Sequence, residues 1–251
     1  MKKKGLMLCI AVLLMLNCIA CGQQTVQGEQ ETEHMPDIGV EVTVENTENT
    51  TTLVDDSFVT NNEASEGLKC IVQVQTDNQR GSGVLWDKQE ELWTFVTAAH
   101  VVGKLEQVEL YFVEEDKMCP AQVHLVEGLD LAFLQVDVEE LPMAVKHAYG
   151  ECKSVSSEIK REDKIWTTGY DAAAEKLEYA GSVLEPWIYT EDFENYMLMC
   201  QCEAWPGMSG GAVFTVEEEL LGIVCGQNEA GLLAVLPVAV IEGEYSLFIN
   251  Y

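Results

Sequence analysis

TFVTAAHVV at residues 94–102 and GMSGGAVF at residues 207–214 are the two stretches that decide the fold and the chemistry of this chain. The first is a run of strand-forming residues that ends at His100. The second places Ser209 in a glycine-rich turn that leads into an apolar strand. A hydroxyl nucleophile needs a base to take its proton, so the two stretches acquire a chemical meaning only together.

A third stretch supplies the group that such a base needs. GLDLAFLQV, residues 128–136, carries Asp130 at the head of another predicted strand. A carboxylate beside a histidine orients its ring and stabilises the imidazolium that forms when the serine proton is taken. The sequence therefore holds a candidate catalytic triad of His100, Asp130 and Ser209. Taken singly, each has an alternative interpretation: a structural histidine, a capping aspartate and a small turn residue.

Short strand-like segments separated by turn residues fill the chain from residue 67 onwards. In the first half they are LKCIVQVQ, GSGVLWD, LWTFVTAAHVV, QVELYFV, AQVHLVEG and DLAFLQV. In the second half they are DKIWTTGYD, EKLEYAGSVLEPW, YMLMCQCEA, GAVFTVEEELLGIVCGQ and GLLAVLPVAVI. This spacing predicts an all-β fold of two barrels, joined by the less regular residues 140–160. Weak helical patterns occur only at AAHVVGK and near the C-terminal end.

Composition limits the classes of partner. An apolar content of 47% and an aromatic content of 8% are typical of a globular core. The formal charge of −29 repels nucleic acid phosphates, so no nucleic-acid partner is expected. Among the six cysteines after residue 21 there is no CxxC pair, which disfavours a zinc site. The predicted chemistry requires neither a metal nor a cofactor.

The N-terminus is predicted to be a signal peptide, residues 1–20. MKKK is a basic start, and the apolar run up to Ala20 is short for a spanning helix. A small residue before Cys21 resembles a bacterial lipoprotein signal, in which this cysteine carries the lipid. The alternatives are an uncleaved anchor or an ordinary signal peptide. Every version exports the remainder, and the lipoprotein version places it at the extracytoplasmic face of the cell membrane.

Residues 21–66 are predicted to be an acidic, disordered linker. They hold no Lys or Arg, and their few apolar residues are scattered. Such a segment cannot bury enough surface to offset its ordering entropy. It is expected to tether the folded domain, residues 67–251, to the membrane.

Six cysteines lie within the predicted domain, and their pairing is left open. An even number in an exported protein permits three disulfides, in 15 connectivities. Cys200 and Cys202 stand two apart in a strand-like segment, so both should face one side and are poorly placed to bridge each other. The alternative is that most of the six are buried small hydrophobic residues. The set is Cys70, Cys119, Cys152, Cys200, Cys202 and Cys225.

The order of these stretches resembles the trypsin/chymotrypsin superfamily, and within it the Deg-type (high-temperature-requirement) branch. The resemblance covers residues 67–245 and rests on GSGVLW, TAAHVV, LDLAFLQV, TTGYD, YAGSVLE, GMSGGAVF, LLGIV and LLAVLPVAV. It implies a chymotrypsin-like fold of two six-stranded antiparallel β-barrels with the active site between them. His100 and Asp130 would come from the first barrel and Ser209 from the second.

The resemblance also implies roles for the turn residues. The N–H groups of Gly207 and Ser209 would form an oxyanion hole. Met208 stands where digestive members have an aspartate that pairs with a freshly cut N-terminus. Activation by such cleavage is therefore not expected. Deg-type proteins commonly carry a peptide-binding PDZ domain after the protease, and none is expected in this chain.

Two signals about the substrate oppose each other. Glu203 stands six residues before Ser209, an offset that in trypsin-like enzymes falls at the floor of the primary specificity pocket. A carboxylate there favours Lys or Arg. The Deg-type resemblance implies an aliphatic preference instead, and apolar Leu233 and Val235 lie near the expected pocket wall. We expect small or medium aliphatic residues at the cleaved bond.

The sequence thus predicts an exported, membrane-tethered serine endopeptidase that cleaves protein or peptide substrates through an acyl-enzyme. The alternative is a protease fold kept as a binding or adaptor module of weak activity, against which the complete triad argues. An ester hydrolase is disfavoured, because the nucleophile lacks the strand–GxSxG–helix setting of α/β-hydrolases. Neither the oligomeric state nor the physiological substrate follows from the sequence.

Overall fold

The computed structural model describes residues 69–152, 154, 158–227 and 231–250. The predicted signal peptide, residues 1–20, and the predicted linker, residues 21–66, lie outside the described residues. Within the described ranges, no helix combines the length and the apolar character that crossing a bilayer requires.

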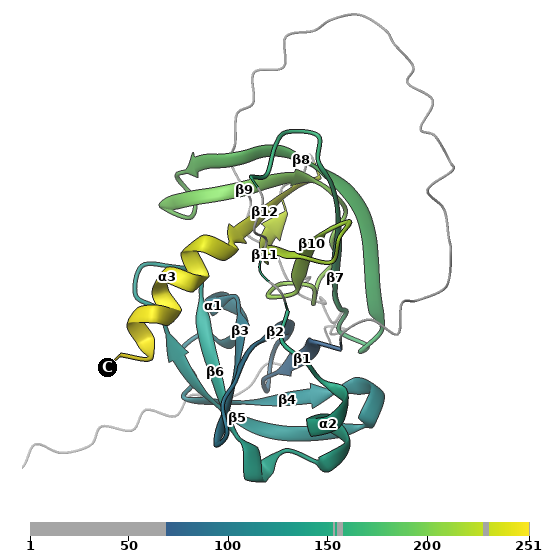
Figure 1. Cartoon of the computed structure of the whole chain (residues 1–251), viewed down its shortest axis with the longest axis vertical. Coiled ribbons are helices and arrows are strands. Elements are labelled where there is room, and N and C mark those ends of the chain that lie inside the picture. The colour runs from purple at the N-terminus through teal and green to yellow at the C-terminus, as the bar shows by residue number, and fades with distance from the viewer. Residues whose placement is uncertain (1–68, 153, 155–157, 228–230, 251) are drawn as a thin grey trace, which may run out of the picture. The chain divides into compact units, whose positions relative to one another are not determined.

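The first barrel is built from six antiparallel strands in the order β1-β2-β3-β6-β5-β4, and the pairing of β1 with β4 closes it (Figure 1). Alternation of buried and less buried residues along β4 shows why these segments form strands with one face inward. The strands are β1 (Ile71–Gln75), β2 (Arg80–Lys88), β3 (Leu92–Thr97), β4 (Gln107–Phe112), β5 (Lys117–Leu125) and β6 (Ala132–Asp137).

The second barrel closes in the order β10-β11-β12-β9-β8-β7, again with antiparallel pairing throughout. The predicted fold of two six-stranded antiparallel β-barrels is therefore confirmed. The strands are β7 (Lys164–Tyr170), β8 (Lys176–Thr190), β9 (Asn195–Gln201), β10 (Ala212–Thr215), β11 (Leu220–Gln227) and β12 (Leu232–Pro237).

The strands of the second barrel contribute to two apolar clusters. Along β12, Leu233 and Val235 belong to a cluster made only of residues from the second half of the chain. Ala234 and Leu236 alternate with them and belong to the larger cluster, which also contains the core of the first barrel. Because successive side chains point to opposite faces of a strand, β12 contributes both to the interior of its own barrel and to the junction with the first.

The C-terminal helix α3 (Val238–Phe248) begins directly after Pro237 and packs on the first barrel. Its Phe248 ring stacks on Phe133 of β6 with 4.9 Å between ring centroids. The Tyr245 hydroxyl donates to the Asp87 carboxylate of β2 at 2.5 Å. Burial, together with this carboxylate, raises the pKa of Tyr245 to about 12. The helix therefore connects the end of the second barrel to the outside of the first.

The other helices are short, and one of them changes where a predicted strand ends. The weak helical pattern at AAHVVGK is the single turn α1 (Ala99–Val102), so the strand that was expected to end at His100 ends at Thr97. The joining region contains α2 (Met143–Ala148). Two 3₁₀ turns follow β4 and β6, at Val113–Glu115 and Val138–Glu140.

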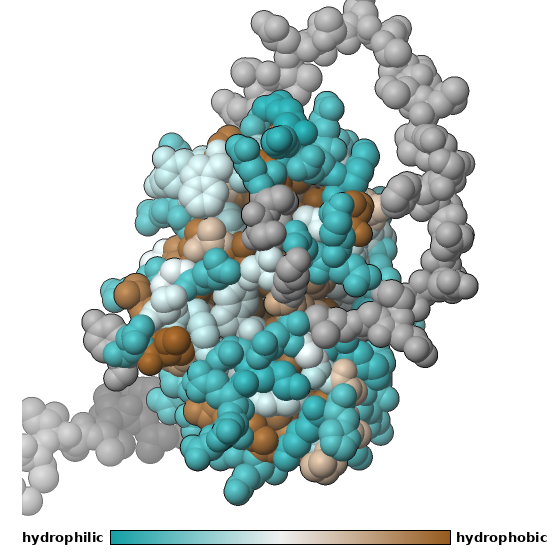
Figure 2. Space-filling view, viewed as in Figure 1, coloured by the Kyte–Doolittle hydropathy of each residue, from teal (hydrophilic) through white to brown (hydrophobic). Residues whose placement is uncertain are grey.

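The surface is mainly hydrophilic on the face that Figure 2 shows, with apolar side chains beside α3. Leu247 and Ile249, at and just after the end of that helix, are more than half exposed. The polar coat agrees with the strong acidic excess of the sequence.

Candidate active site

His100 lies on the single helical turn α1, directly after the end of β3. Val101 and Val102, on the same turn, are buried in the first barrel and hold the turn against it. The His100 side chain keeps 34% of its surface exposed. The turn therefore presents the imidazole at the edge of the first barrel, where a partner group and solvent can both reach it.

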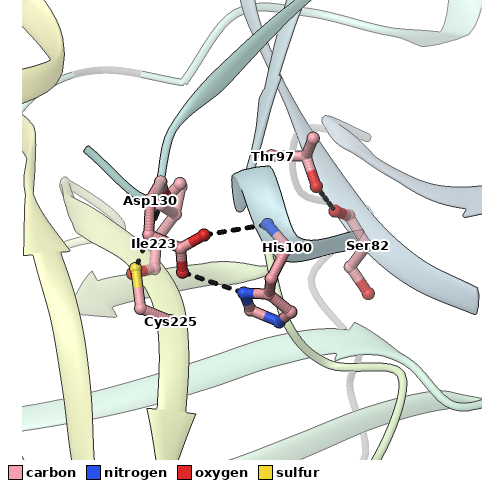
Figure 3. Close-up of polar contacts among 6 residues, drawn as sticks. All are labelled: Ser82, Thr97, His100, Asp130, Ile223 and Cys225. Atoms are coloured by element: carbon pink, nitrogen blue, oxygen red, sulfur yellow. Dashed lines mark hydrogen bonds and ion pairs between the residues drawn. The ribbon is translucent and has the colours of Figure 1, made fainter. Parts of the chain in front are cut away.

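Asp130 holds His100 by two hydrogen bonds (Figure 3). The ring Nδ1 of His100 lies 2.9 Å from Oδ2 of Asp130, and the backbone N–H of His100 donates to Oδ1 at 2.9 Å. Asp130 stands in the loop between β5 and β6, and its side chain is only 15% exposed. A carboxylate at Nδ1 places the ring proton on that nitrogen. Nε2 is then the atom that can accept a proton from a nucleophile.

Cys225 of β11 lies behind Asp130, as Figure 3 shows. Its Sγ is 3.9 Å from the backbone oxygen of Asp130, and the side chain is fully buried. Burial, and the nearby Asp130 carboxylate, raise the pKa of the Cys225 thiol well above its ordinary value. The Cys225 thiol therefore stays neutral beside Asp130.

At two positions in the loop from Gly207 to Gly210, the backbone has a conformation that only glycine adopts easily. Gly207 has φ +99° and Gly210 has φ +80°. A Cβ at Gly207 would lie 2.7 Å from the carbonyl oxygen of Tyr170. Within the described parts of the chain, the N–H groups of Gly207 and Ser209 donate to no recorded acceptor. These are the two donors that were expected to form the oxyanion hole, and both remain available to a ligand.

Ser82 of β2 binds this loop to the first barrel, and it is fully buried. Its backbone N–H donates to the carbonyl oxygen of Ser209 at 2.7 Å. Its hydroxyl donates to the carbonyl oxygen of Gly207 at 2.8 Å and accepts from the N–H of Tyr170 at 2.8 Å. Thr97, at the end of β3, donates to the Ser82 carbonyl oxygen at 2.7 Å. One residue of the first barrel thus fixes both carbonyls that flank Met208.

The same contacts bring the Ser209 loop next to the segment that leads into His100. A Cβ at Gly210 would meet the Ser82 carbonyl oxygen at 2.2 Å and the backbone nitrogen of Ala98 at 3.0 Å. Ser209 itself is 7% exposed. Across the described residues, both recorded hydrogen bonds of His100 go to Asp130, and none joins its ring to the Ser209 hydroxyl. The structure thus pairs His100 with Asp130 and places Ser209 in the adjoining loop without a direct bond.

The residues expected at a specificity pocket lie in different environments. Glu203 is exposed, in the segment between β9 and the Ser209 loop. Leu233 and Val235 are fully buried and pack inside the second barrel, so neither offers surface to a substrate in this structure. The sequence shows that Leu233 and Val235 share one face of a strand, but it does not show whether that face points into the barrel or toward a substrate. The preference for aliphatic residues stays a prediction.

Sequence reasoning does not identify Ser82, Thr97 or Cys225 as part of this site. In the sequence, Ser82 belongs only to GSGVLW, a turn and strand. Its bonds reach Tyr170 and Gly207, which are remote in the sequence, so no local pattern reports them. Cys225 stands out in the sequence only as a possible disulfide partner.

Comparisons with known proteins agree with this architecture. Residues 81–223, more than half of the chain, match the model of the trypsin-like peptidase domain. Among curated proteins, none matches this chain in sequence.

Solved structures share the fold at low sequence identity. The inactive form of the Rv3671c protease aligns with a TM-score of 0.58 and 20% identity, over 70% of this chain and 87% of that one. A mutant of Rv3671c from Mycobacterium tuberculosis H37Rv aligns at 0.57 with 17% identity, over 70% and 85% of the two chains. The serine endoprotease from Yersinia pestis aligns at 0.58 with 20% identity, over 72% and 63%. Sequence identities this low support a shared fold only. The family model, by contrast, matches the amino-acid sequence over residues 81–223. The chain belongs to the trypsin-like peptidase family.

Proposed function

We propose that this protein is a serine endopeptidase with His100, Asp130 and Ser209 as its catalytic triad. The observation that carries the proposal is the paired hydrogen bonding of Asp130 to the ring and the backbone of His100. It occurs in a trypsin-like peptidase domain whose Ser209 loop is bonded to the barrel that carries His100. Protein or peptide substrates follow from that family.

In the proposed reaction, Ser209 Oγ attacks the carbonyl carbon of the scissile bond while His100 Nε2 takes the hydroxyl proton. Asp130 keeps the ring in the required orientation and stabilises its charged form. The tetrahedral oxyanion is held by the N–H groups of Gly207 and Ser209. His100 then gives its proton to the leaving amine, and the acyl-enzyme is hydrolysed by water that His100 activates in turn.

The absence of a recorded bond between His100 and Ser209 in the described structure is compatible with this reaction. In proteins without a bound substrate, catalytic hydrogen bonds are often long and tighten only in the complex. Ser82 holds the carbonyl oxygens of Gly207 and Ser209, which supports a fixed backbone for the loop that contains the expected oxyanion donors.

A fluorophosphonate probe tests the proposal directly. The probe phosphorylates an activated serine, so the wild-type chain should be labelled stably and on Ser209 alone. Ser209→Ala should abolish labelling. Ser246→Ala is the matched control, because Ser246 is exposed on α3 and donates only to a backbone carbonyl. Wild-type protein that folds but remains unlabelled would favour the alternative of a binding or adaptor module.

We also propose that the domain is exported and held at the membrane through Cys21. The support is the basic and apolar N-terminus with a small residue before this cysteine. In a bacterial host, Cys21→Ser should stop incorporation of labelled fatty acid and release the protein from the membrane fraction. Continued membrane association without lipid would show an uncleaved anchor instead. The Deg-type branch stays a prediction.

A further inference from the structure

Two cysteines that are far apart in the sequence meet where the first barrel begins and ends. Lys69 forms an isolated parallel bridge with Tyr149, and the Gly150 N–H donates to the Lys69 carbonyl oxygen at 3.0 Å. Cys70 directly follows Lys69, and its own carbonyl accepts from Leu85 of β2 at 2.7 Å. The segment that leaves α2 toward the second barrel is thereby held beside the segment that enters β1.

This arrangement brings Cys70 and Cys152 into the same apolar cluster. The Cys70 thiol is the neighbour with the largest effect on Cys152, and it raises the pKa of the Cys152 thiol. Cys70 belongs to the main apolar cluster and Cys152 packs against it, so both sulfur atoms lie in one environment. Cys70 is buried, and Cys152 is the less buried residue of the two.

The remaining cysteines of the domain have other partners. Cys119 contacts the Glu140 carbonyl oxygen, Cys225 contacts Asp130, and Cys202 contacts Thr167 and Tyr179. Cys200 packs inside the second barrel on the same side as Cys202, as their spacing predicted. Among the contacts of the described residues, none of these four cysteines has another cysteine as its hydrogen-bond partner.

We propose that Cys70 and Cys152 are a modification site at which a low-molecular-weight or protein disulfide oxidises the pair to an intramolecular disulfide. This inference does not depend on the proposed catalytic function. It selects one bond from the connectivities that the cysteine count leaves open.

The exchange conserves atoms and electrons. Cys152 is the less buried of the two cysteines. Its thiol loses its proton to solvent, and the thiolate attacks one sulfur of the oxidant. The oxidant's S–S bond breaks, and its other sulfur leaves as a thiolate. Deprotonated Cys70 then attacks the Cys152 sulfur of this mixed disulfide and expels the second thiolate. The two cysteines are oxidised by two electrons, and the oxidant is reduced to two thiols, which take up the two protons.

The local environment sets how this reaction responds to pH. The hydrogen bond with Cys70, followed by burial, raises the pKa of the Cys152 thiol well above its ordinary value. The reactive thiolate is therefore scarce at neutral pH, and the rate of oxidation rises with pH. The closed bond would span the whole first barrel and restrict its unfolded state.

The experiment compares the full chain treated with oxidised glutathione and with dithiothreitol. Peptide mapping by mass spectrometry should find the Cys70 peptide joined to the Cys152 peptide after oxidation, and unjoined after reduction. The melting temperature of the oxidised form should be higher by about 5–10 °C. Cys152→Ser should remove this redox-dependent difference, whereas Cys119→Ala, at a buried cysteine of the same barrel, should retain it.

Peptide mapping of the wild-type protein tests the proposed Cys70–Cys152 disulfide even if a variant fails to fold. Either cysteine linked to a different partner, or both found as free thiols or glutathione adducts after oxidation at high pH, would overturn the proposal. An oxidised form with the Cys70–Cys152 link but the melting temperature of the reduced form would overturn the structural role assigned to it.

Discussion

Ser209→Ala and His100→Ala should each lower kcat on a peptide substrate by about 10⁶-fold, by analogy with the losses measured when a serine nucleophile or its histidine is removed. Either change ends covalent catalysis and leaves only the contribution of binding and of the oxyanion donors. The His100 side chain is partly exposed and the Ser209 side chain loses only its hydroxyl group, so circular dichroism and melting should change little. His147→Ala is the matched control, because that histidine is exposed on α2.

The double variant provides the sharper part of this experiment. Because Ser209 and His100 act in one step of the proposed reaction, Ser209→Ala/His100→Ala should be little slower than either single variant. Losses that multiply would mean that the two residues act independently, and the triad assignment would then be wrong. Asp130→Asn should cost about 10⁴-fold, because an amide at this position leaves the His100 ring in the unsuitable tautomer.

Gly210→Ala should produce the largest loss of stability that we expect from a single methyl group. The new Cβ would lie 2.2 Å from the Ser82 carbonyl oxygen and 2.3 Å from the Thr97 hydroxyl oxygen, both of them in fully buried residues. Alanine at φ +80° costs about 1–2 kcal/mol, and overpacking adds about 1–3 kcal/mol. We expect a total of about 2–5 kcal/mol in the free energy of unfolding, measured by denaturant titration.

Gly128→Ala separates the two contributions. Gly128 has nearly the same backbone angle, φ +78°, but no atom lies within 4 Å of the position that an added Cβ would take. It should therefore cost only the conformational part, about 1–2 kcal/mol. Equal losses for the two variants would show that the Ser209 loop yields to the methyl group. In that case the close approach to the first barrel would not be what holds the loop.

The existence of the strands and the number of barrels could be predicted from the sequence, because they depend on local alternation. The triad of His100, Asp130 and Ser209 was named from short motifs and stays a prediction. The ends of elements were less certain: the same residues that suit a strand up to Thr97 continue into the turn that carries His100. Leu233 and Val235 were expected at a pocket wall, yet they pack inside the second barrel. The sequence could not predict this, because alternation along a strand does not say which of its two faces points inward.

Contacts between segments that are far apart in the chain could not be predicted from the sequence, for a different reason. Ser82 holds Gly207, and Cys70 meets Cys152, only after two barrels and their connection have closed. No spacing rule relates such pairs, because the intervening chain sets their positions through its full topology. The sequence could therefore name candidate residues for the chemistry, but not the residues that hold the Ser209 loop in place.

The late position of β12 in the chain has a consequence for when activity can arise. β12 pairs with both β9 and β11, so the second barrel cannot close before this strand has been made. The Ser209 loop depends on that barrel, since the Gly210 N–H donates to the Val224 carbonyl of β11 at 2.8 Å. During synthesis on the ribosome, His100, Asp130 and Ser209 all emerge earlier than β12 and α3. The nascent polypeptide therefore carries every residue of the proposed triad before the loop that holds Ser209 has its support from the closed second barrel.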